Sequence, residues 1–448
     1  MTQPPAPGAE KNVFYPEIPE KRLSNGLRVL VVRDDRFPRL SVKLVLSVGR
    51  VCNPDDNLAL VSLTVELLKS GTRTRSARDI SNLIDQWAIQ YASEVLMEHG
   101  CISMTLLEHH LEPALELLSD IVRNPSFIEH ELKKLKVRWK SHLIAQRSQP
   151  NFLATERAFK TIYPAHPYSK VSMTPEDLER ATAESVLNTY RRHCVPGNAY
   201  LLFAGPIDLD QATGLAERFL GSWESQEAPS IDYPQPAPIA RRLVCLVHRP
   251  HSVQSQILLG CRTLPKVHPD AIALKVANQV LGGGASARLF LNLREQKGYT
   301  YGVYSRLKSY RHDGLFLAEA SVKTEVTLES IEEMLKELEH MRKQLPEEEE
   351  LSRSQSELIG SFIRQMESPA SVGALEVNRR LYQLPEGFYR NFIPTVRGVK
   401  REMVREMARR FFDPERVVLT VVADRARVEN ELQNLGELRL YDVHGNRI

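Results

Sequence analysis

Apolar positions along the chain follow two periods, which together predict a protein of helices and strands. Apolar runs rich in β-branched residues predict strands at residues 27–33, 40–48, 89–96, 101–107 and 198–204. Apolar residues at helical spacing predict helices at residues 57–69, 76–87, 110–123 and 128–146. The first of these helices is apolar on nearly every side and should be buried. We expect Asp55 or Asp56 to cap its start and Gly71 to end it.

The same order of elements returns in the second half of the chain. Strand-like runs at residues 243–249, 255–260 and 417–423 and a helical run at residues 271–281 repeat the earlier pattern. Between the halves, a stretch with four prolines and no periodicity is typical of an extended linker. We therefore predict an α+β fold of two homologous domains, each an antiparallel-rich sheet packed with helices. The predicted units are a flexible lead-in at 1–16, an N-terminal domain at 17–225, a Pro-rich linker at 226–240 and a C-terminal domain at 241–443.

Composition and charge exclude several classes of partner. A net charge of +3 over 448 residues is too small to favour nucleic acid or an anionic membrane. No apolar run approaches the roughly 20 residues that span a bilayer, so no membrane insertion is expected. The five cysteines are widely spread and form no CxxC pair, which favours reduced thiols and a cytoplasmic protein. The predicted location becomes the periplasm if an export signal has been removed.

The segment LGGGASARLFLNLREQKGYTYGV, at residues 281–303, carries the candidate chemistry. Three glycines precede a predicted short helix at 287–294, a turn follows, and then a strand rich in Tyr and Val. Arg294 and Tyr301 lie on either side of the turn, so a guanidinium and a phenol could face one cleft and bind peptide carbonyls. The glycines allow close approach of another chain, or they serve only the turn. The spacing fits neither a phosphate loop nor a dinucleotide fingerprint.

This segment resembles the second-domain signature of the insulinase/pitrilysin peptidases, LGGG-x-S-S-R-L-F-x-x-L-R-E-x-x-G-x-x-Y. The matching residues are Leu281, Gly282, Gly283, Gly284, Ser286, Arg288, Leu289, Phe290, Leu293, Arg294, Gly298 and Tyr301, and Ala287 departs from the second Ser. The resemblance covers about residues 17–443 and implies that the two domains form half of a peptidase chamber. It also implies that Arg294 and Tyr301 contact the substrate and its reacting carbonyl, and that Gly282–Gly284 and Ser286 bind substrate.

The zinc motif of that family is missing from the predicted buried helix. Catalytic members bind zinc there through HxxEH, in which residues i, i+3 and i+4 share one helical face. Aligned on the family pattern, those positions hold Ser62, Val65 and Glu66, while the later helix that supplies a third ligand holds Ser141 and His142. A catalytic zinc site needs three protein ligands and an open position. We therefore expect no metal and no other cofactor on this chain.

These observations lead to two hypotheses of different classes. In the first, the chain is the non-zinc, substrate-binding subunit of a heterodimeric metalloendopeptidase that degrades unfolded peptides. It would be inactive alone, form a possible homodimer in isolation, and supply Arg294 and Tyr301 to a site whose zinc lies on a homologous partner with HxxEH. In the second, it is an inactive structural or peptide-binding homologue, like the core subunits of respiratory complexes. A self-sufficient zinc peptidase with other ligands is a further alternative.

Overall fold

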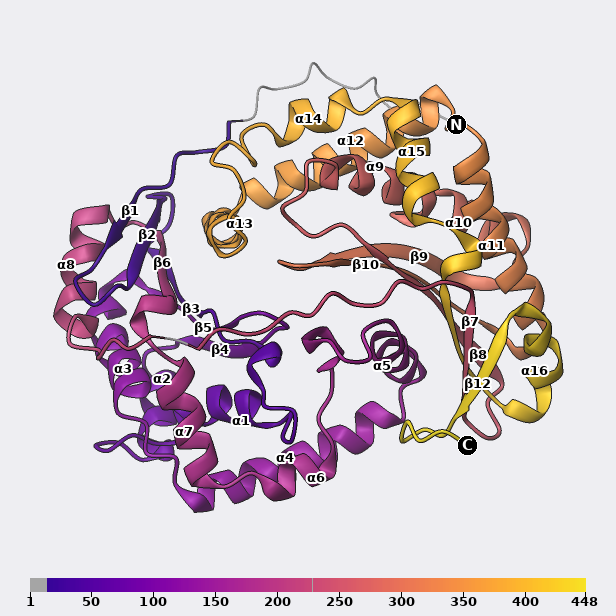
Figure 1. Ribbon diagram of the computed structural model, residues 1–448. Coiled ribbons are helices and arrows are strands. Elements are labelled where there is room, and N and C mark those ends of the chain that lie inside the picture. Colours follow the sequence, from indigo (N-terminus) through magenta and orange to yellow (C-terminus); the bar gives the residue numbers. More distant parts are fainter. Residues whose placement is uncertain (1–13, 228) are drawn as a thin grey trace.

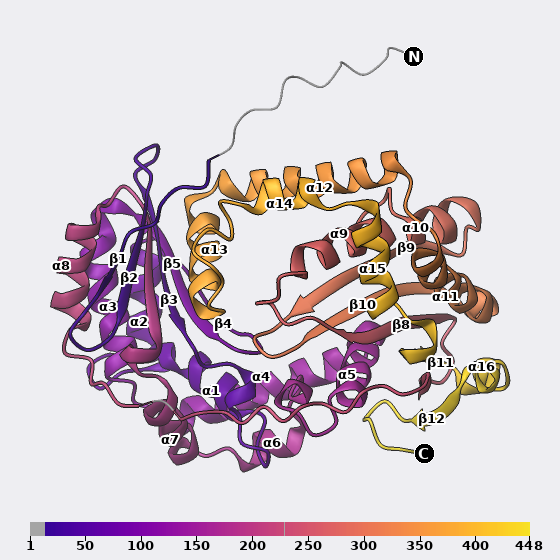
Figure 2. The same cartoon turned by 45° about the horizontal axis from the view of Figure 1, so that its top comes forward.

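The computed structural model describes residues 14–227 and 229–448. The predicted lead-in at 1–16 falls almost wholly outside these residues. Two sheets stand at opposite sides of the molecule, and helices cover them and connect one side to the other (Figure 1). The same arrangement is visible after a 45° turn (Figure 2). The predicted α+β class with two mixed sheets is confirmed.

The first sheet has six strands in the order β1-β2-β6-β3-β5-β4. Its strands are β1 (Glu20–Arg22), β2 (Arg28–Arg33), β3 (Arg39–Leu46), β4 (Gln90–Val95), β5 (Gly100–Leu107) and β6 (Ala199–Gly205). β2 and β6 pair in parallel, and β3 runs antiparallel to both β6 and β5. β4 pairs only with β5, so its other edge is open.

The second sheet repeats this plan in the order β12-β7-β11-β8-β10-β9. Its strands are β7 (Leu243–His248), β8 (Gln254–Thr263), β9 (Thr300–Ser309), β10 (Gly314–Lys323), β11 (Val418–Ala423) and β12 (Glu437–Tyr441). β7 and β11 are parallel as β2 and β6 are, and β9 is the open edge as β4 is. The duplication predicted from the order of apolar runs is therefore present in the topology.

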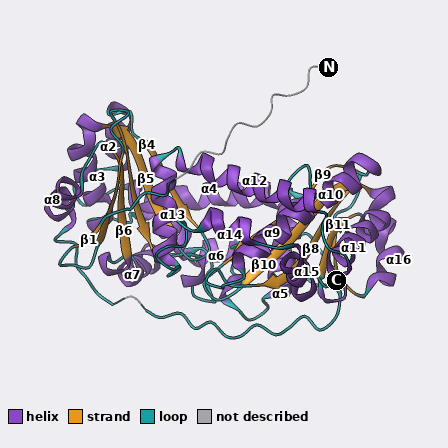
Figure 3. Ribbon diagram, turned by 90° about the horizontal axis from the view of Figure 1, so that it is seen from above, coloured by secondary structure: helices purple, strands orange, loops and turns teal. Residues whose placement is uncertain are grey.

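Helices flank both sheets, and the described residues of the chain between them, 221–227 and 229–242, have no regular structure and run along the outside of the molecule (Figure 3). In the first half they are α1 (Leu60–Leu67), α2 (Ala77–Gln86), α3 (Leu111–Arg123), α4 (Glu129–Arg147), α5 (Pro150–Ile162), α6 (Pro175–Arg180), α7 (Ala183–His193) and α8 (Leu209–Leu220). In the second half they are α9 (Ala271–Gly282), α10 (Arg288–Phe290), α11 (Thr327–Lys343), α12 (Glu348–Met366), α13 (Pro369–Leu381), α14 (Phe392–Gly398), α15 (Arg401–Phe411) and α16 (Arg425–Leu432).

The two halves exchange helices. α5, from the first half, packs on β8 and β11 of the second sheet, and α13, from the second half, packs on β6 and β2 of the first sheet. The hairpin turns also meet, because Glu98 accepts a 2.6 Å hydrogen bond from the Tyr168 hydroxyl and a 3.0 Å bond from the Arg311 backbone nitrogen. Each sheet is therefore covered in part by a helix from the other half, and this fixes how the sheets face each other.

The start of α1 differs from the prediction. Neither Asp55 nor Asp56 caps the helix; instead the buried Asn53 side chain accepts a 2.9 Å bond from the Val61 backbone nitrogen. Asp55 points away and pairs with Lys170 at 3.0 Å. The prediction of an aspartate cap was wrong because the 3-10 turn at Arg50–Cys52 brings the following asparagine beneath the first turn of α1.

Candidate functional site

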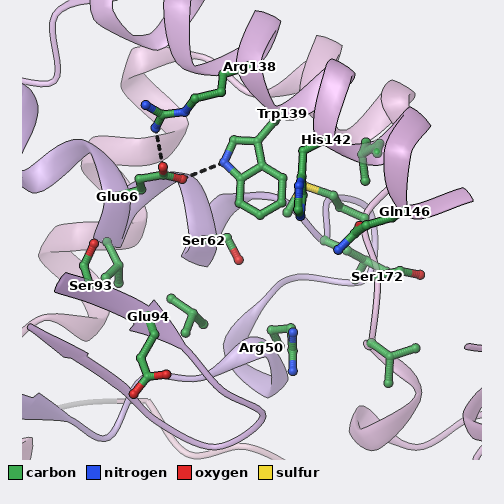
Figure 4. A pocket seen from close by; sticks show the side chains of 16 residues that line it. Arg50, Ser62, Glu66, Ser93, Glu94, Arg138, Trp139, His142, Gln146 and Ser172 are labelled. Carbon is green, nitrogen blue, oxygen red and sulfur yellow. Dashed lines mark hydrogen bonds and ion pairs between the residues drawn. The ribbon is translucent and has the colours of Figure 1, made fainter. Parts of the chain in front are cut away.

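A cavity of about 410 Å³ surrounds the positions at which the family pattern places its zinc motif (Figure 4). α1 contributes Ser62 and Glu66, and α4 contributes His142. Ser62 and Glu66 are one helical turn apart and are the only residues of α1 that are not fully buried. The structure thus brings together four of the residues identified by motif position, since Val65 also lines the cavity. Ser141, on the next position of α4, does not line the cavity and its hydroxyl turns to the Val137 carbonyl at 3.4 Å.

Glu66 is held by two side chains of α4. Its carboxylate forms an ion pair with Arg138, and it accepts a 2.7 Å hydrogen bond from Trp139 Nε1 (Figure 4). The Trp139 ring also meets the His142 ring edge-on, with centroids 5.2 Å apart. Both oxygens of the carboxylate therefore already have donors, one of them cationic.

These residues do not fit a catalytic zinc ion. Val65, at the position of the catalytic base, offers no proton acceptor and is buried, and Ser62 is a poor zinc ligand compared with His or Cys. Glu66 would have to leave Arg138 and Trp139 to bind a cation. Among residues 14–227 and 229–448, no group of three or more His, Cys, Asp or Glu side chains is arranged to hold a metal ion.

Arg50 is a cavity residue that the sequence did not indicate. It follows β3, lines the cavity from the side opposite α4, and forms no ion pair in the described part of the chain. Its Nε atom is buried without a hydrogen-bond partner there, and burial lowers the pKa of its guanidinium. No sequence signal distinguishes this arginine, because its place depends on how the turn after β3 packs against α4.

The second candidate segment contains a π-helix. After α10 the chain widens into π-helical turns at Leu291–Gln296, and Arg294 lies within them. The predicted short helix at 287–294 is therefore present, although its second part is not α-helical. Arg294 is half exposed, with its guanidinium 4.7 Å from the centre of the Phe290 ring and its Nε 3.6 Å from Glu295. Such π-helical segments occur frequently at functional sites.

Tyr301 lies on a β-bulge at the beginning of β9. The register between β9 and β10 shifts here, because Thr300 pairs with Val322 and Val303 pairs with Ala320. The Thr300 hydroxyl supports the bulge through a 2.7 Å bond to the Ser321 carbonyl. Tyr301 is 91% exposed, and its hydroxyl has no hydrogen-bond partner in the described residues. Bulges of this kind redirect a side chain out of the regular strand pattern.

One backbone bond joins the segments of the two candidate residues. The Tyr299 nitrogen donates to the Leu293 carbonyl at 2.9 Å, directly beside Arg294 and two residues before Tyr301. The chain turns between them at Gly298, whose φ of +67° lies in the left-handed region that glycine adopts easily. Arg294 and Tyr301 are therefore both exposed, on two adjacent parts of one turn.

The glycine run starts inside the protein and ends at its surface, because Gly282 is buried, Gly284 is half-buried and Gly283 is exposed. Gly282 lies so close to β9 that a Cβ there would be 2.6 Å from Ser305 Oγ and 2.9 Å from the Ser305 backbone nitrogen. The Ser286 hydroxyl donates a 2.5 Å hydrogen bond to Glu357 of α12. These contacts hold α9, the loop after it and α12 together beneath the Arg294–Tyr301 turn.

Comparison with known proteins places the chain in a family. Residues 28–176 match the family model described as "Insulinase (Peptidase family M16)", and residues 180–358 match "Peptidase M16 inactive domain". The two matches together cover more than half of the sequence. The chain belongs to the insulinase family. The resemblance read from the glycine-rich segment is thus confirmed, and the match over the second half is to the inactive domain of the family.

Relatives within the family carry different descriptions. "Uncharacterized zinc protease YmxG" of Bacillus subtilis (strain 168) is 24% identical over 390 residues, which are 87% of this chain and 94% of that protein. "Non-peptidase homolog YmxG" of Helicobacter pylori is 21% identical over 289 residues, which are 63% of this chain and 66% of that protein. The names of the relatives therefore include both zinc proteases and a non-peptidase.

Solved structures share the fold. A peptidase M16 inactive domain from Pseudomonas fluorescens superposes with a TM-score of 0.83 at 21% identity, covering 91% of this chain and 98% of that one. A Helicobacter pylori protease gives 0.86 at 18% identity, covering 92% and 100%. The periplasmic protease PqqL of Escherichia coli gives 0.75 at 19% identity, and here the chain spans 93% of its own length but 46% of PqqL. Among the described residues of the present chain, no helix is both long and apolar enough to cross a bilayer.

Proposed function

We propose that this chain is the non-zinc-binding, substrate-binding subunit of a heterodimeric zinc metalloendopeptidase acting on unfolded peptides. The partner is a homologous chain with HxxEH, and it supplies the zinc. This chain supplies Arg294 and Tyr301, which reach the partner's site in trans. Alone, it is inactive as a peptidase. The cytoplasm remains the predicted location.

One contrast supports the proposal. At the zinc-motif positions the Glu66 carboxylate is already bound by protein side chains, whereas Arg294 and Tyr301 are exposed to solvent. Glu66, the one remaining side chain that could bind a metal at the motif positions, is neutralised by Arg138 and Trp139. Tyr301, by contrast, extends from a supported bulge with a free hydroxyl. An exposed phenol without a partner has no evident role in the stability of this chain, so we assign it to a contact outside the chain.

The chemistry of the two side chains suits that contact. The Tyr301 hydroxyl can donate to the oxygen of a carbonyl that becomes negatively charged during attack by water. The Arg294 guanidinium carries five donors and no acceptor, and it is suited to holding peptide carbonyls in place. Gly282–Gly284 and Ser286 remain predicted substrate contacts, and the internal contacts of Gly282 and Ser286 favour a supporting role for these two. The match to 46% of the longer PqqL chain leaves room there for a second unit of similar size.

The proposal is tested by reconstitution. The chain is mixed with an HxxEH-bearing homologue from the same organism, and cleavage of an unfolded, fluorescence-quenched peptide is measured for each chain alone and for the mixture. We expect cleavage by the mixture to exceed the sum of the separate chains. The same rate for the mixture as for the HxxEH chain alone would refute the heterodimer.

Tyr301→Phe separates the role of the hydroxyl from that of the ring. Loss of one donor to a developing oxyanion lowers kcat by about 10²-fold or more. Tyr304→Phe is the matched control, because Tyr304 lies on the same strand, is also exposed, and its ring packs against Phe290 with centroids 5.6 Å apart. Equal activity of the two variants in the mixture would remove Tyr301 from the reaction.

The alternative is a structural or peptide-binding protein without a peptidase role. The description of the Helicobacter pylori relative as a non-peptidase homolog favours it. Under this alternative the chain co-purifies with other subunits, for instance those of a membrane redox complex, and no HxxEH partner gains activity from it. Isolation of a tagged chain from its own cells, followed by identification of bound proteins, distinguishes the two.

A further inference from the structure

Four cations in or near two of the cavities have no carboxylate ion-pair partner among the described residues. Arg50, Lys266, Lys275 and Lys308 form no ion pair and no side-chain hydrogen bond with any residue of the ranges 14–227 and 229–448. We refer to them as the inner basic cluster. Arg50 comes from the first half of the chain, and the three lysines come from the second half.

Each lysine of the cluster lies against an aromatic ring instead of a carboxylate. The Nζ atoms of Lys266, Lys275 and Lys308 are 3.9, 5.0 and 5.3 Å from the ring centres of Tyr382, Phe392 and Phe159, respectively. A ring face attracts a cation but leaves its charge uncompensated. Lys275 is exposed and Lys266 and Lys308 are half-buried, so these positions keep a positive charge that a ligand can reach.

The members of the cluster lie close enough to influence each other. Lys266 and Lys275 line one cavity of about 470 Å³ together with residues of α12, α13 and β9. Burial lowers the pKa of Lys266 to about 8, and the nearby charge of Lys275 contributes to this shift. Burial also lowers the pKa of Lys308, and the charges of Arg306 and Arg50 add to the effect. The four cations therefore form two pairs: Lys266 and Lys275 line this cavity, whereas Lys308 lies near Arg50, which lines the cavity of α1 and α4.

The carboxylates around the cluster are already in use. Glu98 accepts bonds from the Tyr168 hydroxyl and the Arg311 backbone, Glu319 pairs with Arg306, and Glu94 lies 3.9 Å from Lys43. Moving any of them to the cluster would leave another donor unsatisfied. The cations of the cluster are therefore available to an acidic ligand.

We propose that the inner basic cluster binds acidic segments of extended polypeptides, so that the substrates of this subunit are rich in Asp and Glu. The inference rests on the proposed function and adds the substrate class to it. A peptide fits better than a nucleic acid, because the cations are interspersed with apolar and aromatic side chains such as Phe362, Phe388 and Tyr389 in the same cavity. The small net charge of +3 gives no broad electrostatic field for a nucleic acid.

The test measures binding to the isolated chain, so that its outcome is independent of peptidase activity. An unstructured fluorescein-labelled peptide with several Asp and Glu residues is titrated with the chain, and fluorescence anisotropy gives Kd. A second peptide carries Lys at the acidic positions. We expect the acidic peptide to bind at least about tenfold more tightly, and its affinity to fall as salt is added. Equal Kd values for the two peptides overturn the proposal, whereas absence of cleavage with a partner overturns only the proposed function.

Matched variants locate the site. A triple variant should bind the acidic peptide about tenfold or more weakly; it combines Lys266→Gln, Lys275→Gln and Lys308→Gln. The control combines Lys133→Gln, Lys323→Gln and Lys400→Gln, which removes the same net charge from exposed positions and should change Kd little. Replacing the three inner lysines by Arg keeps the charge and should keep binding, which separates charge from folding. If the control variant weakens binding of the acidic peptide as much as the lysine variant does, the proposal is wrong. It is also wrong if a single-stranded oligonucleotide binds more tightly than the acidic peptide and loses affinity when the same lysines are replaced.

Discussion

The substitution Gly282→Ala tests whether the glycine run supports the Arg294–Tyr301 turn. Gly282 is the last residue of α9 and lies directly against β9. An added Cβ would be 2.6 Å from Ser305 Oγ and 2.9 Å from both the Ser305 backbone nitrogen and a methyl carbon of Leu289. The hydroxyl can rotate away, but the backbone nitrogen belongs to the strand that carries Tyr301. Relief of the clash therefore requires α9 and β9 to move apart.

The magnitude follows from two opposing effects. Overpacking of a buried contact costs about 1–3 kcal/mol. Replacement of a helical Gly by Ala returns about 0.5–1 kcal/mol because the unfolded chain loses less entropy. We expect a net destabilisation of about 1–2 kcal/mol. Gly284→Ala is the matched control, because its Cβ would be 3.2 and 3.4 Å from the side-chain ends of Glu357 and Gln279 and would touch no backbone atom there, so stability should change by no more than about 0.5 kcal/mol.

Unfolding in urea is monitored by circular dichroism. The urea concentrations at the transition midpoint are compared between variants whose transitions have the same slope. Ser305→Ala removes the nearest of the three clashing atoms, so the double variant Gly282→Ala/Ser305→Ala should be less destabilised than the sum of the single variants. A Gly282→Ala protein as stable as the natural one would refute the packing argument. A Gly284→Ala protein that folds normally but loses peptide cleavage in the reconstituted mixture would instead show that the run contacts substrate.

Three further predictions concern stability. His166 is 3% exposed and its Nδ1 accepts a bond from the Tyr168 nitrogen, and burial together with nearby positive charge lowers its pKa to about 4. Because the unfolded state binds this proton more tightly, the free energy of unfolding should fall as pH drops from about 6.5 to 4. His166→Asn should reduce this dependence of the free energy on pH by up to about 1.4 kcal/mol per pH unit, measured by urea unfolding at several pH values. Glu156 is 4% exposed and forms ion pairs with Arg147 and Lys160. Glu156→Ala should lower the free energy of unfolding by about 3–5 kcal/mol, measured from the same urea curves, because two cations lose their partner. Asn53→Ala should cost about 0.5–2 kcal/mol through the start of α1, whereas Asp55→Ala should leave the melting temperature unchanged.

The sequence by itself determined the order and the type of most elements. Apolar period is a local property, because residues that share a face of a strand or helix are only a few positions apart. It therefore located β2, β6, α2 and the repeat of the whole pattern in the second half. Motif spacing likewise placed Ser62 and Glu66 on one face of α1, since residues four apart meet in any α-helix.

Only the tertiary structure decided which distant groups meet. The exchange of α5 and α13 between the halves depends on contacts between segments far apart along the chain, and no local period encodes them. The same is true of the α4 side chains that bind Glu66, of Arg50 across the cavity from them, and of the asparagine that takes the place of an aspartate at the start of α1. In each case a charged or polar group binds a partner that is distant along the chain, and the packing of the whole fold determines which partner is within reach.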